Sequence, residues 1–271
     1  MAGDPERIDE SALPFVAPCR VLRAGAPLTW LRLGIADFRR AWPQSLAYGM
    51  FMAAAMALVS WLAWRYGSYW FMLAMVGGFV FIAPLTCTGL YVLSAQLDRG
   101  QRPSLREALR SALRLYIGNE LVFTLVLLAI FLVWARAGAM LSVFFPARGQ
   151  PTLRDMIGYL SIGSVIGAVF ATLTFAVSAF SLPMIVDRRV DAVTAAVTSI
   201  NAVLRNRLVT ALWLGLIVVG VVLGFATLFI GLAVILPVIG HAAWHGYLEA
   251  IDANGFPRHD SGVTSTPDVR T

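Results

Sequence analysis

Long apolar segments alternate along the chain with shorter, arginine-containing stretches. Apolar runs of about 20 residues, enough for a helix to cross a hydrocarbon core about 30 Å thick, begin at six places. These are near Leu46, Tyr69, Glu120, Ser161, Leu208 and Gly231. The last two runs come from one almost continuous apolar stretch, 208–247, which we divide within its glycine-rich part, 224–231. The pattern predicts an all-α membrane protein, a helical bundle with six transmembrane helices.

The predicted spans form three repeats of one unit. Each unit has a short amphipathic interfacial helix followed by a helix hairpin, and the second span of each hairpin contains a proline. We expect helix kinks at these prolines, since proline removes one backbone hydrogen bond from a helix. The kinks could enclose a cavity, as broken helices do in transporters, or serve packing within the bundle. The prolines are Pro84, Pro183 and Pro237.

This repeat pattern divides the chain into three parts. Residues 1–28 are an N-terminal cytoplasmic arm, 29–251 the membrane domain, and 252–271 a polar cytoplasmic tail that we expect to be disordered. The repeats within the membrane domain cover about 29–100, 101–190 and 191–251.

The interfacial helix of the second repeat has the most regular pattern. Ser104 and Glu107 form a capping box, and arginines recur every four residues beside an apolar stripe. We expect this basic face to lie on the membrane surface, against anionic lipid headgroups. The arginines are Arg102, Arg106, Arg110 and Arg114.

The first and third interfacial helices repeat the pattern less regularly. Their predicted caps are Thr29 and Asp191. The predicted apolar stripes are Leu31, Ile35, Phe38 and Trp42 in the first, and Val193, Ala196, Val197, Ile200 and Leu204 in the third.

Composition and charge support a membrane location. Hydrophobic residues make up 59% of the chain and charged residues 13%, which is too apolar for one soluble domain. All 21 basic residues are arginine, and 17 of them lie on the side of the predicted bundle that carries both termini. Because positive residues stay in the cytoplasm, we expect both termini there. The net charge of +6 suits an anionic membrane surface rather than nucleic acid.

One pair of residues could carry chemistry. His241 and His245 are four residues apart, on one face of a helix. They could bind haem or a metal ion, or contribute to a proton path. Alternatively, they bond headgroups, loop carbonyls or the backbone freed near Pro237. No further metal ligands can be named, and Cys19 and Cys87 have neither disulfide nor metal spacing.

No catalytic motif accompanies this pair. The chain contains no Walker loop, nucleophile elbow, zinc motif or dinucleotide fingerprint, so we predict no catalytic residues and no enzymatic activity. Gly163 and Gly167 have the GxxxG spacing that allows close helix contacts. Such contacts could form within the chain, with another membrane protein or with a second copy.

Three stretches carry a resemblance to a known family. They are "APLTCTGLYVLSAQLDRGQRPSL", "SAFSLPMIVDRRVDAVTAAVTSINAVL" and "ATLFIGLAVILPVIGHAAWHGYL". The sequence resembles, over about 30–251, a family of predicted bacterial integral membrane proteins of unknown function, some of which are labelled as similar to subunit I of cytochrome c oxidase. The resemblance implies the bacterial inner membrane and supplies no catalytic residues.

The leading functional hypothesis is a non-enzymatic accessory or binding protein of a membrane complex. One alternative is a transporter or channel for a small solute, with its cavity near the three prolines. A second alternative is a haem or metal redox protein that uses His241 and His245.

Overall fold

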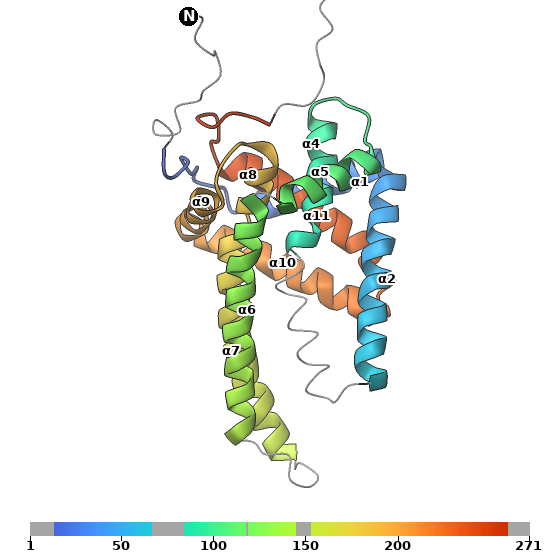
Figure 1. Cartoon of the computed structure of the whole chain (residues 1–271), viewed down its shortest axis with the longest axis vertical. Helices are drawn as coiled ribbons and strands as arrows, with labels where there is room; N and C mark the ends of the chain where they lie inside the picture. Colours follow the sequence, from blue (N-terminus) through green and yellow to red (C-terminus); the bar gives the residue numbers. More distant parts are fainter. Residues whose placement is uncertain (1–13, 67–83, 118, 145–152, 260–271) are drawn as a thin grey trace, which may run out of the picture.

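The computed structural model describes residues 14–66, 84–117, 119–144 and 153–259 (Figure 1). Regular structure within these residues is α-helical, apart from two isolated β-bridges, so the predicted all-α class is confirmed. The helices are α1 (Ala26–Arg40), α2 (Trp42–Tyr66), α4 (Thr88–Asp98), α5 (Leu105–Ile117), α6 (Asn119–Phe144), α7 (Leu153–Ser178), α8 (Ser181–Asp187), α9 (Ala192–Arg205), α10 (Arg207–Ala226) and α11 (Leu232–Ala250).

Four stretches of the described chain are long and apolar enough to cross a membrane. Only 11–33% of each is buried within the protein, as expected for helices whose outer faces contact lipid. In Figure 1, α2, α6 and α7 run along the long axis of the molecule, whereas α10 lies obliquely across it. The predicted multi-pass membrane class is therefore confirmed. The stretches are Trp42–Leu62, Leu121–Leu141, Ile157–Asp187 and Arg207–Ala226.

The six-span arrangement itself is not confirmed. The run predicted to start near Tyr69 lies almost entirely outside the described residues, in 67–83. The run predicted from Gly231 forms α11, which is not among the four candidate spans. The second half of α11 contains two histidines and Glu249, which make the helix too polar for a candidate membrane span. The predicted division between the last two runs is correct, since α10 ends at Ala226 and α11 begins at Leu232.

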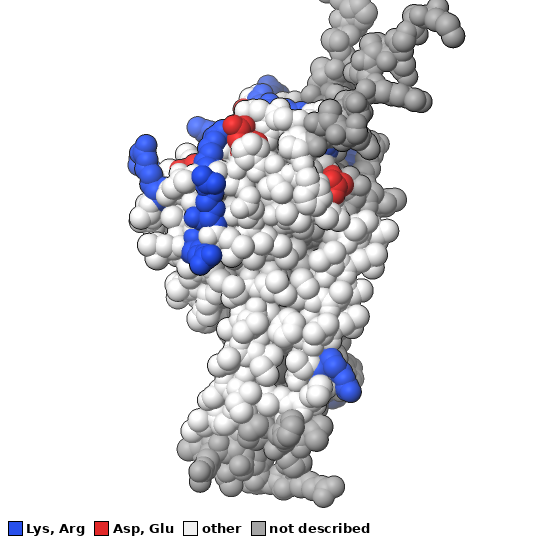
Figure 2. Space-filling model, turned by 90° about the vertical axis from the view of Figure 1, so that its left-hand side faces the viewer, with Lys and Arg blue, Asp and Glu red and all other residues white. Residues whose placement is uncertain are grey.

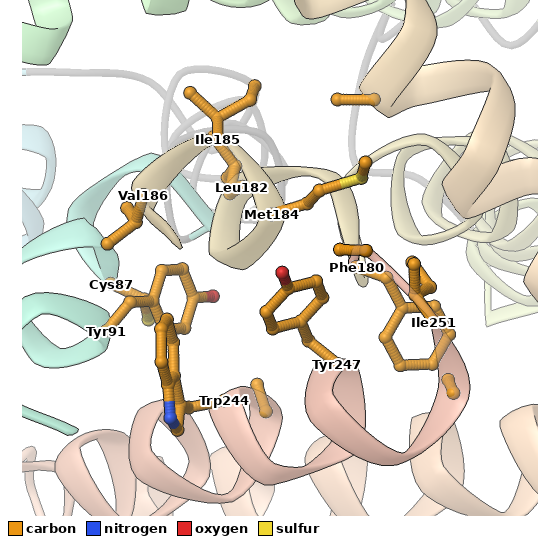
Figure 3. Close-up of a cluster of buried hydrophobic side chains, with 14 of the residues drawn as sticks. Cys87, Tyr91, Phe180, Leu182, Met184, Ile185, Val186, Trp244, Tyr247 and Ile251 are labelled. Carbon is orange, nitrogen blue, oxygen red and sulfur yellow. The ribbon is translucent and has the colours of Figure 1, made fainter. Parts of the chain in front are cut away.

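The segments that follow the three prolines meet at one end of the molecule. These are α4, α8 and the second half of α11, which contact one another. Figure 3 shows their side chains pointing toward a common centre. We call this end, with the surrounding helices α1, α5 and α9, the head. Its fully buried side chains include Leu90 and Leu93 of α4, Leu182 and Met184 of α8, and Trp244 and Tyr247 of α11.

Each amphipathic helix packs on one of these three segments. Helix α5 lies on α4, α9 lies on α8 and α1 lies on α11. Trp30 of α1 is fully buried and makes edge-to-face contacts with Phe180 and Trp213. The amphipathic helices therefore belong to the packed interior of the head.

The faces by which α1 and α9 pack differ from the predicted apolar stripes. Buried positions of α1 include Gly34 and Asp37, and those of α9 include Ala195, Thr198 and Ala202. Several inward positions carry small residues, which let neighbouring helix backbones approach closely, although Trp30 of α1 is also fully buried. Other large apolar residues of these two helices point outward, as the exposed Leu28, Val193 and Leu204 do.

The described residues on either side of the membrane domain pack on the head. Ala17 donates its N–H to Thr198 Oγ1 at 3.1 Å, and Leu22 donates to Asn206 Oδ1 at 2.8 Å. Residues 252–259, assigned from the sequence to the polar tail, follow α8: Arg188 Nη1 donates to the Phe256 carbonyl at 2.8 Å. The packed part of the chain therefore extends from the arm to residue 259.

Candidate functional site

The two histidines of α11 face three other helices rather than the membrane surface. His241 is fully buried. Its Nε2 lies 2.8 Å from Ser45 Oγ of α2, and its Nδ1 lies 2.6 Å from Ser94 Oγ of α4. Both ring nitrogens are therefore engaged by hydroxyl groups of the protein.

His245, one helical turn further along α11, contacts an acidic side chain. Its Nε2 lies 2.8 Å from Oδ2 of Asp37, which is 4% exposed. The same oxygen accepts a hydrogen bond from Ser94 Oγ at 3.3 Å. Ser94 therefore joins the two histidines through Asp37, and we call the five residues the polar cluster: Asp37, Ser45, Ser94, His241 and His245.

The polar cluster resembles a structural network more than a ligand site. A buried polar group is costly unless it is hydrogen-bonded, and both nitrogens of His241 and Nε2 of His245 have partners from the protein. A haem or metal ligand must offer an imidazole nitrogen that is free of such a partner, and His241 does not. Within the described residues, no group of three or more His, Cys, Asp or Glu side chains is arranged to hold a metal ion.

A second buried network centres on Asp187, at the end of α8. Its carboxylate accepts hydrogen bonds from Arg188 Nε at 2.9 Å, from the Tyr247 hydroxyl at 2.9 Å and from Arg99 Nη2 at 3.3 Å. Arg258 lies 3.8 Å away. One carboxylate thus connects α4, α8, α11 and the segment after α11. Buried charges of this kind are stable only when paired.

Glu249 does not join the histidine pair. Its Oε2 accepts a 2.6 Å hydrogen bond from the indole N–H of Trp30. This bond satisfies the polar atom of a fully buried tryptophan. It also fixes α1 on α11 one turn beyond His245.

An apolar cavity of about 400 Å³ lies between α4, α7, α10 and α11. Thr174 is 1% exposed, and its hydroxyl has no hydrogen-bond partner in the described part of the chain. A cavity with so few polar groups suits an apolar ligand rather than a polar solute. Its lining includes Tyr91, Thr174, Ser178, Trp213, Phe225 and Ile239.

The cysteines show no sign of reactivity. Cys87 is buried, and Cys19 lies where residue 19 pairs with Ile251. Burial raises the pKa of the Cys19 thiol, against the opposing attraction of Arg205. A protonated thiol is a poor nucleophile.

The three prolines occupy different positions in their helices. Pro84 is the first described residue of its segment, and 84–86 are helical just before α4. Pro183 lies in the first turn of α8, after a turn that separates α7 from α8. Pro237 lies inside α11, where it leaves the carbonyl of Ala233 without its helical donor.

Gly49 of α2 packs against this freed carbonyl. A Cβ atom added at Gly49 would overlap the Ala233 oxygen and lie 2.7 Å from Pro237 Cγ. Glycine thus allows α2 and α11 to come together where α11 is interrupted. Protein atoms therefore fill the space beside Pro237.

The predicted basic face lies on the outside of the head. Arg102, Arg106 and Arg110 are exposed. The backbone of Arg114 belongs to α5, but its side chain lies outside the described residues. Ser104 caps α5, accepting from the Glu107 N–H at 3.4 Å, but the predicted capping box is incomplete because the Ser104 N–H donates to Gln96 Oε1 at 2.9 Å. Glu107 itself accepts from Gln96 Nε2 at 3.2 Å, which joins α5 to α4.

Sequence reasoning missed Asp37, Ser45 and Ser94 as partners of the histidines. Ser94 is 147 residues from His241 and Asp37 is 208 residues from His245, so no spacing relates them. One signal was available: Asp37 is an isolated acid in an arginine-rich amphipathic helix, on the side that does not carry the apolar stripe.

The apolar helices, their exposed faces and the arginine-rich head define a multi-pass integral membrane protein. Residues 71–187 match a family described as "Predicted integral membrane protein (DUF2189)". The predicted resemblance to such a family is confirmed over this segment, which contains Pro84 and Pro183. No curated protein matches the chain. No solved structure matches it either.

Proposed function

We propose that this protein is a non-enzymatic binding or accessory protein of a membrane complex in the bacterial cytoplasmic membrane, with both termini in the cytoplasm. The observation that carries the proposal is the concentration of exposed arginines on the head. Figure 2 shows basic side chains at the head end and a wide uncharged belt below them. The exposed head arginines are Arg20, Arg23, Arg32, Arg39, Arg40, Arg102, Arg106, Arg110, Arg189, Arg205, Arg207 and Arg258.

The dense packing of the head supports a binding role over a transport role. A water-filled path near the three prolines would need polar, hydrated side chains. That region instead contains buried leucine, methionine and aromatic side chains. A fixed head can hold arginines in a constant arrangement, as a surface for anionic headgroups or an acidic partner requires.

The polar cluster supports a non-redox role for the histidines. Both nitrogens of His241 lie within hydrogen-bond distance of serine hydroxyls, and His245 lies against Asp37. Binding of haem or metal by His241 would require its contacts to break. Their role in the proposal is to hold α1, α2 and α4 on α11.

The test is co-purification of the tagged protein from its native membrane in mild detergent, quantified by mass spectrometry. The variant replaces Arg102, Arg106 and Arg110 together by glutamine. Its matched control is Arg136→Gln, an exposed arginine of α6 away from the head. We expect a defined partner with the wild type and with the control, and at least a tenfold loss with the triple variant. Equal recovery of the partner with the wild type, the control and the triple variant would refute the proposal that these arginines form the binding surface.

The apolar cavity favours a second candidate function, binding or movement of an amphipathic solute with one hydrocarbon chain. The test is cross-linking of a diazirine-bearing phospholipid, mapped by peptide mass spectrometry. Ala171→Phe places a large side chain in the cavity lining, and Val169→Phe changes a lipid-facing residue of the same helix that is 62% exposed. Cross-links on α7 and α10 that fall with Ala171→Phe alone support this function; cross-links unaffected by either variant exclude it.

A further inference from the structure

The connection between α10 and α11, residues 227–231, exposes large apolar side chains. Leu228 is 80% exposed and Ile230 is 77% exposed. No Asp, Glu, Lys, Arg or His occurs anywhere in 208–240. In water, two such side chains at a loop tip would lose the stabilisation that burial of apolar surface provides. Lipid is the surrounding in which this exposure is favourable.

In their parts most distant from the head, other helices carry charged residues or tryptophans. Helix α2 ends with exposed Trp61, Trp64 and Arg65, and α6 has the exposed Arg136 in its second half. Tryptophan and arginine near the end of a span are typical of the membrane–water interface. The 227–231 tip has neither.

The N–H groups of the tip are satisfied within the hairpin. Each N–H group from Thr227 to Ile235 donates to a partner within the hairpin. The Thr227 hydroxyl donates to the Gly224 carbonyl at 2.8 Å and accepts from the Gly231 N–H at 2.8 Å. Closure is maintained although Leu228 and Phe229 have positive φ angles of 51° and 70°. Internal satisfaction of these donors is a condition for a turn surrounded by hydrocarbon, where no water can accept from them.

The length and direction of α10 place its end inside the bilayer. A helix of 20 residues is about 30 Å long, which equals the hydrocarbon thickness only if the helix stands upright. Figure 1 shows α10 oblique to α2, α6 and α7. Starting from the head, its C-terminal end therefore stops short of the far surface.

We propose that α10 and α11 form a re-entrant hairpin whose tip, 227–231, lies among lipid acyl chains and is exposed on neither side of the membrane. The hairpin replaces the predicted fifth and sixth spans. Both termini remain on the same side of the membrane. The tip contains no arginine, so the distribution of arginines between the two sides of the membrane is also unchanged.

The first test is the accessibility of single cysteines in intact cells and in inverted vesicles. The parent carries Cys19→Ser and retains the buried Cys87 as the blank. Leu228→Cys is compared with Trp64→Cys at the end of α2 and with Arg106→Cys on the head. We expect a membrane-impermeant maleimide to label positions 64 and 106 from opposite sides, and position 228 at least tenfold more slowly from both. Labelling of position 228 from the far side within twofold of position 64 would overturn the proposal.

Spin labels at the same positions report the surroundings directly. At Leu228→Cys, collisions of the nitroxide with O₂ should exceed collisions with a water-soluble nickel chelate several-fold, and at Trp64→Cys the chelate should dominate. Chelate dominance at position 228 contradicts the proposal, because the tip would be in water. Low collision rates with both reagents contradict it too, because protein would cover the tip.

A third test uses the Thr227 hydroxyl. Thr227→Val leaves the Gly231 N–H without its acceptor in hydrocarbon, so the yield of folded protein should fall several-fold, whereas Thr227→Ser should restore it. Wild-type yield for Thr227→Val would count against a lipid location, since water could replace the lost acceptor.

Discussion

The Nε2 atom of His245 lies 2.8 Å from Oδ2 of Asp37, although 208 residues separate the two in the sequence. The contact joins α1 to α11, the first and last of the described helices. Asp37 is 4% exposed, so this pair is formed largely out of water. No spacing in the sequence predicts this contact, and it is the contact most informative about the role of the histidines.

This pair should show strong energetic coupling. In a cycle of Asp37→Ala, His245→Ala and the double variant, we expect a coupling free energy of about 1–3 kcal/mol, typical of residues in one buried network. Unfolding in mixed micelles supplies the measurement. Asp37 also lies 3.9 Å from Arg40, whose side chain is 70% exposed; the matched cycle with Arg40→Ala should give less than about 1 kcal/mol. Equal couplings would mean that His245 is no more than a surface partner.

Gly49→Ala should destabilise the protein strongly. The new methyl group would overlap the Ala233 carbonyl and meet Pro237, so α2 and α11 would have to separate at a cost of about 1–3 kcal/mol or more. Gly215→Ala in α10 is the control, since a Cβ there meets nothing within 4 Å. Thermal unfolding in detergent should show a lower Tm for Gly49→Ala alone. A Tm unchanged by Gly49→Ala would disprove the close packing.

Asp187→Ala should have a large effect because it leaves Arg188 buried without its carboxylate. Arg188 is 8% exposed and Asp187 is 2% exposed. Removing one partner of a buried pair costs about 3–5 kcal/mol. Asp252→Ala serves for comparison: its pair with Arg20 has side chains 39% and 52% exposed, and exposed pairs contribute about 0–1 kcal/mol. The two variants are compared by denaturant unfolding, and similar losses would contradict a buried network at Asp187.

Asp191 should give the cap of α9 a pH dependence. Its carboxylate accepts from the Val193 and Thr194 N–H groups, both at 2.9 Å. Burial opposes ionisation, but hydrogen bonds from Thr194 and the nearby backbone outweigh it and lower the pKa. The stabilisation is therefore present above the ordinary pKa of about 4 and is lost as pH falls through the lowered value.

Two substitutions of Asp191 distinguish the effect of its capping hydrogen bonds from the effect of its charge. Asp191→Ala should cost about 1 kcal/mol at neutral pH. Asp191→Asn should retain most of the cap and remove its contribution to the acid dependence. Stability measured from pH 7 to pH 3 distinguishes these effects; identical pH profiles for wild type and Asp191→Asn would show that the charge has no role.

Local patterns predicted several elements correctly. The boundary between α10 and α11, the Ser104 and Asp191 caps and the apolar helices all depend on residues close in sequence. The packed faces of α1 and α9 could not be read in this way. In lipid, the large apolar stripe can face outward, so inward positions such as Gly34 and Ala195 are marked by small size instead.

The partners of the histidines were beyond sequence reasoning for a different reason. Ser45, Ser94 and His241 meet only because tertiary packing brings α2 and α4 against α11. A spacing of four residues placed the two imidazoles on one face correctly. It could not show that serine hydroxyls and a carboxylate already occupy that face.

The most direct test of the account is the absorption spectrum and metal content of the protein purified in mild detergent, with His241→Ala alongside. The account predicts a preparation without a Soret band or stoichiometric metal, and a variant whose Tm falls while its spectrum stays the same. Stoichiometric haem or metal in the wild type, lost on His241→Ala, would contradict the structural role of the polar cluster and establish a redox protein instead.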